Sequence, residues 1–229
     1  MKRAVGVGRP GAFRTLPGRV LAFVAALLAL ATAAAGGPVA ASASGAKLVR
    51  SLAEIRGQDV VRQEWDLSCG AAVVATIFTY QLGRPTTERD VAVAMLKRTS
   101  PTLVRSRLGF SLLDLKIFAA THGVSAAAFA DMDLGDLDRL APVITPISLR
   151  GFRHFVIYRG RAGGRVLLAD PAFGNRTMPE EVFRKAWANG IGFVIFDPAR
   201  PQAPNRMGAP ADLFLMPNAQ TERAAIAGG

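Results

Sequence analysis

The chain has 229 residues, of which 50% are hydrophobic and 7% aromatic, and its formal net charge is +11 at pH 7. That length suffices for one well-packed domain or at most two small ones. The basic residues form no Lys/Arg block and do not alternate with aromatic residues, which argues against a nucleic-acid partner. The sequence also lacks a Gly-x-x-x-x-Gly-Lys-Ser/Thr loop, which excludes a phosphate-binding ATPase motor.

The N-terminus has the pattern of an export signal. Arg14 and Arg19 precede an uncharged apolar run, Val20–Ala35, and a small-residue cleavage pattern stands at residues 41–43. Residues 1–43 are therefore predicted to be a signal peptide, which places the mature protein in the periplasm or outside a bacterial cell, with no further contact with the membrane. The alternative is an uncleaved membrane anchor, because the run approaches the length that spans a bilayer.

Helical patterns dominate the first half of the remaining chain. The segment 69–82 is almost wholly apolar, so we expect a helix buried in the core, with Gly83 at its C-terminal end. Amphipathic helices are predicted at residues 87–98 and 111–122. A short strand is expected near residues 59–61.

The second half changes to short β-rich runs, separated by Gly, Pro or charged turns. The predicted strands are 143–149, 154–158, 166–169 and 193–196, with a hairpin connection at 161–164 and a short helix at 179–189. Helices first and an antiparallel sheet afterwards indicate the α+β class. The domain is expected to cover residues 44–198. The proline-rich residues 199–229 are expected to form a flexible tail, in which Leu213–Met216 could dock.

The chain contains one cysteine, Cys69, which excludes an intramolecular disulfide. Ser68 can cap the predicted helix, which places Cys69 in the first turn, where free N–H groups and the helix dipole favour an anion. The thiolate is the nucleophilic form of cysteine, and Gly70 leaves a substrate room to approach the sulfur. The sequence thus indicates a reactive nucleophile. The alternative is a buried structural cysteine.

Gln63 lies six residues before the cysteine, in the loop that enters the predicted helix. Acyl transfer builds negative charge on a carbonyl oxygen, which needs donors that are fixed before the reaction. The backbone N–H of Cys69 can be one donor, and the side-chain amide of Gln63 can be the other. The alternative is an ordinary surface glutamine.

The chain has two histidines, His122 and His154. His122 stands at a predicted helix end, where a cation suits the last carbonyls, so a structural role is expected. His154 opens an apolar strand and is the candidate base, because an imidazolium stabilises a thiolate and later protonates the leaving amine. Asp170 ends the next strand, 16 residues later, and can orient the imidazole. The alternatives are a partly buried histidine bonded to a carbonyl and a turn-forming aspartate.

Three segments in order carry a family resemblance: Arg62–Ala72 with Gln-x5-Cys-Gly, His154–Val156 with His-Phe-Val, and Asp170–Gly174 with Asp-Pro-Ala-x-Gly. They resemble the bacteriocin-processing peptidases that cut double-glycine leaders. The resemblance covers most of the expected domain. It implies a papain-like fold with a central nucleophile helix and the site residues Cys69, His154, Asp170 and Gln63.

The residues and the resemblance together predict a cysteine peptidase that hydrolyses peptide bonds through a thioester and processes an exported peptide or protein. One alternative is an inactive papain-like binding module, since Ser68 stands where the family often has Asp and since no exporter is fused to this chain. Another is an acyltransferase or deamidase with the same Cys–His pair. The basic segments 97–107 and 150–153 hint at anionic partners. Two scattered histidines and one cysteine make no metal ligand set, so no metal or other cofactor is expected.

Overall fold

The computed structural model describes residues 50–149, 151–201 and 203–214, so the signal peptide predicted at 1–43 lies outside the described residues. The first element is a short helix, α1 (Leu52–Gly57), and an irregular segment follows it. The strand expected near residues 59–61 is wrong. The N–H of Val61 donates to the side-chain hydroxyl of Thr76 at 3.0 Å, so a single polar side chain takes the place of a strand partner.

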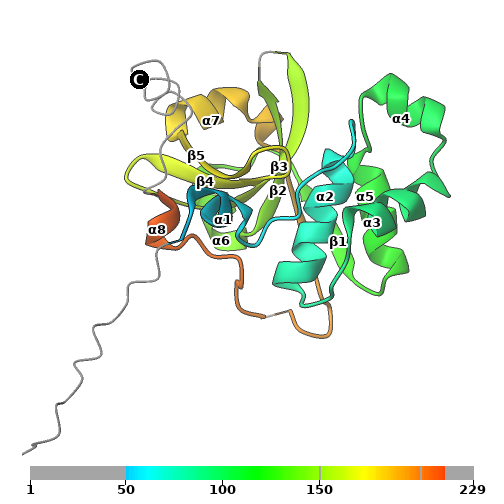
Figure 1. The fold of residues 1–229 in the computed structure, drawn as a ribbon, viewed down its shortest axis with the longest axis horizontal. Coiled ribbons are helices and arrows are strands. Elements are labelled where there is room, and N and C mark those ends of the chain that lie inside the picture. Colours follow the sequence, from blue (N-terminus) through cyan, green and yellow to red (C-terminus); the bar gives the residue numbers. More distant parts are fainter. Residues whose placement is uncertain (1–49, 150, 202, 215–229) are drawn as a thin grey trace, which may run out of the picture. The chain divides into compact units, whose positions relative to one another are not determined.

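Four helices form the first half of the fold (Figure 1). They are α2 (Cys69–Thr76), which continues as the π-helical turn η1 (Ile77–Gln81), then α3 (Glu88–Leu96), α4 (Pro101–Arg107) and α5 (Leu112–Thr121). Every residue of α2 is buried, as its apolar sequence predicts. The starts of α3 and α5 are fixed by capping boxes, in which the side chain at the cap and the side chain three positions later bond each other's backbone. The three helices predicted in this half are thus confirmed.

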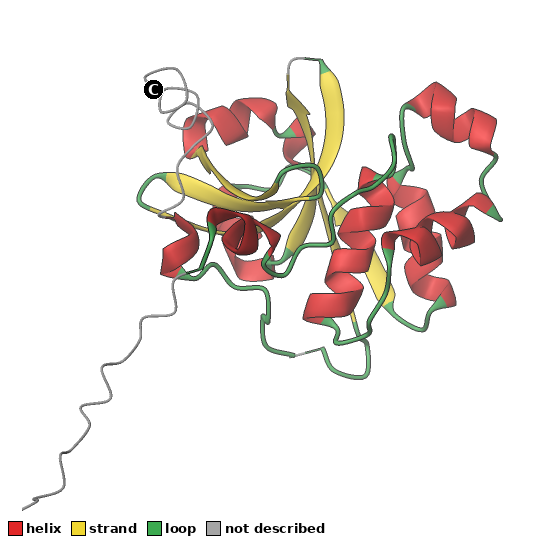
Figure 2. Cartoon of the chain, in the orientation of Figure 1, coloured by secondary structure: helices red, strands yellow, loops and turns green. Residues whose placement is uncertain are grey.

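A single antiparallel sheet of six strands forms the second half, and Figure 2 shows its curvature in yellow. The strands are β1 (Ser125–Phe129), β2 (Val143–Leu149), β3 (Phe152–Ala162), β4 (Arg165–Asp170), β5 (Gly174–Pro179) and β6 (Gly192–Phe196). Their hydrogen-bonded order is β1-β6-β2-β3-β4-β5. Two helices and a 3₁₀ turn lie between these strands in the sequence: α6 (Leu134–Leu140), α7 (Glu180–Ala186) and η2 (Ala188–Gly190). The α+β class is confirmed, since helices precede an antiparallel sheet.

Hydrophobic clusters cover both faces of the sheet. One cluster joins α2 and α5 to the sheet through buried side chains such as Val73, Leu115 and Ile157. The other joins α6 and α7 to it through Leu137 and Phe183. Alternate residues of β3 and β4 serve the two clusters, as the period of two in a strand requires. The two layers fix the start of α2 relative to the central strands.

Part of the segment after β6 packs on the domain. Met207 and Leu213 are fully buried, and Leu213, in the short helix α8 (Ala211–Phe214), lies against Leu167 of β4. The buried Arg159 donates to the carbonyl oxygens of Met207 at 2.9 Å and Gly208 at 3.0 Å. A flexible tail was predicted from residue 199, in which Leu213–Met216 could dock. Leu213 does pack on the sheet, whereas the described residues between 198 and 206 are exposed, and the end of the predicted tail lies outside the described residues.

The burial of Leu213 generates a stability prediction. Leu213→Ala should lower the free energy of unfolding by about 2–3 kcal/mol, because it removes buried methyl groups from a small cluster. The matched control is Leu52→Ala on α1, where the leucine is 47% exposed and the expected change is below about 0.5 kcal/mol. Urea unfolding of both variants measures the difference. Equal losses in the two would contradict the packing of this segment.

Candidate active site

Cys69 is the first residue of α2 and is 7% exposed. The helix start is therefore placed as predicted, but its expected cap is not formed. The hydroxyl of Ser68 does not accept from the helix, and its one proton is shared between the carbonyl of Trp65, at 2.6 Å, and the carboxylate of Glu88. The reason is conformational, because Ser68 has φ −95° and ψ 7°, whereas a capping residue is extended. The N–H groups of the first turn thus keep their partial positive charge for an anion at the sulfur.

The loop before Cys69 is held by a buried carboxylate that the sequence did not single out. Glu88, the first residue of α3, is 4% exposed. Its carboxylate accepts from the backbone N–H of Glu64 at 2.9 Å and from the hydroxyl of Ser68. The only sequence signal was an acidic residue at a predicted helix start, which is common at exposed positions. Glu88 therefore links the loop before Cys69 to α3.

His154 and Asp170 lie on adjacent strands, β3 and β4, and their side chains are bonded. Nε2 of His154 and Oδ1 of Asp170 are 2.8 Å apart. The same Oδ1 accepts from the backbone N–H groups of Ala172 at 2.9 Å and Phe173 at 3.3 Å. Asp170 is thus both bonded to the imidazole and the start of a turn, so the two interpretations of this residue are compatible.

The imidazole of His154 also interacts with the thiol of Cys69. Since Nε2 is occupied by Asp170, Nδ1 is the ring nitrogen left for the sulfur. Burial opposes the protonated imidazole, but hydrogen bonds to Asp170 and Cys69 and the negative charges of both raise the pKa of His154 to about 9. The structure therefore brings Cys69, His154 and Asp170 together, and both partners of the imidazole favour its protonated form.

Asp170 is fully buried, which by itself disfavours its charge. Burial raises the pKa of this carboxyl, but the hydrogen bond from His154 and the charges of Arg176 and His154 outweigh it and hold the pKa below its usual value. Nη2 of Arg176 lies 2.7 Å from Oδ2 of Asp170. Arg176 was missed in the sequence, where nothing distinguishes it from the many other arginines.

Gln63 is attached to this site through its backbone. Its N–H donates to the carbonyl of Pro171, the neighbour of Asp170, at 2.9 Å. Its side-chain Nε2 donates to the carbonyl of Trp65, in the loop before Cys69, at 3.3 Å. Its Oε1 is buried and has no hydrogen-bond donor among the described residues. Because this amide nitrogen carries two N–H groups, one can remain on the carbonyl of Trp65 while the other serves as an oxyanion donor.

Two other sequence interpretations can be compared with the structure. His122 caps the end of α5, where its Nδ1 lies 2.8 Å from the carbonyl of Phe118, and its ring stacks on that of Phe118, which confirms the structural role. The room expected at Gly70 is already filled. A Cβ there would lie 3.2 Å from Leu115 and 3.3 Å from Phe110, so this glycine serves the packing of α2 instead of substrate access.

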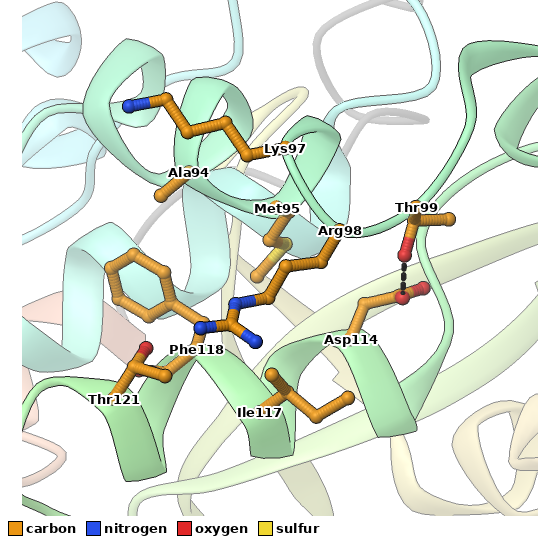
Figure 3. A pocket seen from close by; sticks show the side chains of 9 residues that line it. All are labelled: Ala94, Met95, Lys97, Arg98, Thr99, Asp114, Ile117, Phe118 and Thr121. Carbon is orange, nitrogen blue, oxygen red and sulfur yellow. Dashed lines mark hydrogen bonds between the residues drawn. The ribbon is translucent and has the colours of Figure 1, made fainter.

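Most of the basic segment 97–107 forms the helix α4. A cavity of about 390 Å³ lies between the end of α3 and α5. Figure 3 shows the Arg98 side chain extending from the end of α3 toward Phe118 of α5, beside the bonded pair Thr99 and Asp114. None of the four predicted site residues lines this cavity. Within the described ranges, no cluster of His, Cys, Asp or Glu could hold a metal, and no helix is long and apolar enough to cross a bilayer.

The chain is similar to known proteins in sequence and in fold. The model of the peptidase C39 family matches residues 58–199. Two proteins named probable functional amyloid protease FapD are similar in sequence, one from Pseudomonas aeruginosa at 37% identity over 150 residues and one from Pseudomonas fluorescens at 34% over 149. Each alignment covers 65% of this chain and 65% of the relative, so the chain spans about two-thirds of the length of these relatives.

A solved structure is similar in fold. It is the peptidase domain of Streptococcus ComA, a bi-functional ABC transporter involved in quorum sensing, with a TM-score of 0.50 and 22% identity over 59% of this chain and 96% of that domain. This likeness confirms the papain-like fold that the sequence resemblance implied.

The charge of His154 can be measured directly. In a His122→Gln background, which leaves one imidazole, NMR titration should show His154 losing its proton near pH 9. Asp170→Asn should lower that midpoint, because the carboxylate is one of the groups that raise it. A midpoint near the ordinary 6.5 in the parent protein would contradict the geometry of the site.

Proposed function

The chain belongs to the peptidase C39 family, and we propose that it is a cysteine peptidase that hydrolyses peptide bonds with Cys69 as the nucleophile and His154 as the base. One observation carries the proposal: the start of a buried helix brings a sulfur to an imidazole whose other nitrogen is bonded to a buried carboxylate at 2.8 Å. A nucleophile, a base and an orienting group in that order are the arrangement that nucleophilic acyl transfer needs.

The reaction follows from the charges of this pair. The Cys69 thiolate attacks the carbonyl carbon of the scissile bond, and the electron pair of the C=O bond moves to the oxygen. The His154 imidazolium gives its proton to the leaving amine as the C–N bond breaks and a thioester remains. Neutral His154 then takes a proton from water, whose oxygen attacks the thioester. The acid product leaves and the thiolate and imidazolium are restored.

The oxygen that gains charge in both steps requires donors. The N–H of Cys69 is at the start of α2, where backbone N–H groups have no partner within the helix. Gln63 supplies the second donor through the N–H of Nε2 that does not bond to the carbonyl of Trp65. Its backbone bond to Pro171 keeps Gln63 beside the triad.

The substrate that we propose is an exported peptide or protein. The N-terminal sequence supports export, since a basic region precedes an apolar run and a small-residue cleavage pattern. The relatives are named probable functional amyloid proteases, which supports a protein of an amyloid system as the substrate. The peptidase would then meet its substrate in the periplasm or beyond it.

Cys69→Ala should abolish cleavage and leave the fold intact, because it removes only the sulfur. Mass spectrometry of the secreted proteins, with and without an intact Cys69, identifies the terminus that disappears. His154→Gln should have the same effect, whereas His122→Gln, the matched control at the end of α5, should leave cleavage unchanged. Equal cleavage by the Cys69→Ala variant would refute the proposal. A new amide or released ammonia instead of a cut chain would assign acyl transfer or deamidation.

Gln63→Glu should lower kcat by about 10²–10³-fold with little change in KM, because it removes an oxyanion donor at nearly constant shape. The matched control is Gln81→Glu at the end of η1, where the glutamine bonds to Pro204 and Arg206. Steady-state kinetics on the cleaved peptide measures both. A loss confined to KM, or an equal loss in the two variants, would remove Gln63 from the oxyanion site.

A further inference from the structure

Arg176 reaches the site from β5, the strand beyond Asp170. In the β4–β5 ladder Asp170 lies opposite Gly174 and Leu168 lies opposite Arg176. Asp170 and Arg176 are therefore diagonal neighbours on one face of the sheet, a spacing that long side chains bridge. On the other side, continuing the β3–β4 register from Ile157↔Ala169 makes His154 the diagonal neighbour of Asp170. One carboxylate thus lies between two cationic side chains from the two flanking strands.

The contact of Arg176 with Asp170 is an ion pair. Nη2 and Oδ2 are 2.7 Å apart, but they are not aligned as a hydrogen bond, so the interaction acts mainly through charge. The Arg176 side chain is 28% exposed, and its guanidinium lies over the ring of Phe173 at 5.3 Å from the ring centre. The Asp170 end of the pair is fully buried, whereas Phe173 is 63% exposed and leaves the guanidinium partly open to solvent. An ion pair with one end buried is screened less than one at an open surface.

We propose that Arg176 is a positioning residue of the catalytic pair, which keeps the Asp170 carboxylate charged and in place whether or not His154 carries a proton. The catalytic benefit of this arrangement rests on the proposed peptidase function, whereas the effect of Arg176 on Asp170 and His154 does not. Asp170 has two oxygens with separate tasks: Oδ1 binds the imidazole and two backbone N–H groups, and Oδ2 faces the guanidinium.

The electrostatic reason concerns the state after His154 loses its proton. The groups that act on Asp170 through their charge are His154 and Arg176, and those that act on His154 are Asp170 and Cys69. With Arg176 present, a neutral imidazole still leaves the buried carboxylate one counter-charge. Without Arg176, loss of that proton leaves an unpaired buried anion, which is costly. The imidazole of an Arg176 variant would therefore hold its proton to a higher pH.

This effect matters because the proposed reaction uses His154 in both protonation states. The first step needs the imidazolium as an acid, and hydrolysis of the thioester needs the neutral imidazole as a base. The positive charge of Arg176 remains beside Asp170 when His154 gives up its proton. The Asp170 carboxylate then still has a counter-charge, which favours the second step. Arg176 thus acts on catalysis through Asp170 and touches neither the sulfur nor the scissile bond.

The test compares Arg176→Gln with Arg176→Lys in the His122→Gln background. The matched control is Arg165→Gln, because Arg165 belongs to the same β4–β5 ladder but bonds to Thr177 at 3.0 Å and not to the triad. NMR titration of His154 and urea unfolding are measured for all three. Neither readout needs a substrate, so the inference can fail or succeed independently of the peptidase proposal.

Arg176→Gln should raise the titration midpoint of His154 by about one pH unit. Arg176→Lys keeps the positive charge, so its midpoint should stay close to the wild-type value. Arg165→Gln should leave the midpoint unchanged. An unchanged midpoint in Arg176→Gln, with a stability loss equal to that of Arg165→Gln, would reduce Arg176 to a structural residue and overturn the inference. If the midpoint shifts but the wild-type chain cleaves nothing, the positioning role stands and the proposed function fails.

Discussion

The contact between the start of α2 and the start of β3 is the constraint on which the site depends. The sulfur belongs to the helical half and the imidazole to the sheet, so neither half can make the pair alone. The buried side chains of α2, among them Val73 and Val74, hold the helix against the sheet. Because protein interiors pack closely, a shift of α2 along the sheet would create voids or overlaps that cost free energy. Hydrophobic packing therefore sets the distance over which the charges interact.

The side-chain groups of the site follow one another from the helix α2 across three neighbouring strands of the sheet. The thiol, the imidazole, the carboxylate and the guanidinium come from α2, β3, β4 and β5 in turn. Each buried charge has a neighbour of opposite sign, which offsets the cost of removing it from water. The raised pKa of His154 and the lowered pKa of Asp170 are two consequences of this pairing. An isolated Cys–His pair would lack the outer counter-charge.

The sequence predicts the parts of this protein whose signals are local. Apolar runs and caps identify α2, α3 and α5, and the alternating runs identify four of the six strands. The remaining two were missed for physical reasons. β1 consists largely of alanine, which has little strand preference, and forms because β6 offers its edge. β5 is polar and pairs with β4 across a tight turn. α4 had a signal in Ser100 and Pro101, a cap followed by proline at the first turn, which the basic composition of the segment obscured.

The same distinction applies to the site. Gln63, Cys69, His154 and Asp170 were predicted because their order and spacing form a motif. Glu88 and Asn175 had no such signal, since each acts on partners far away in the sequence, and nothing distinguishes Arg176 from the many other arginines. Asn175 donates to the carbonyl oxygens of Ile55 and Gln58. Glu88 thus ties the loop before Cys69 to α3, and Asn175 ties the segment after α1 to the sheet.

The path of the chain before Gln63 shows why such ties are needed. After α1 the backbone has no strand partner, so its polar groups need side-chain or loop partners to be buried. Asn175 supplies them at one end and Thr76 at the other, and the backbone of Pro171 receives the N–H of Gln63. Gly174 lets this segment pass, because a Cβ there would lie 2.5 Å from the carbonyl of Arg56 and its φ of +80° disfavours other residues. The Asp-Pro-Ala-x-Gly turn thus contacts both sides of the candidate site: Asp170 is bonded to His154, and Pro171 and Gly174 contact the segment that leads to Gln63. A substitution in that turn would act on the proposed base and on the proposed oxyanion donor together.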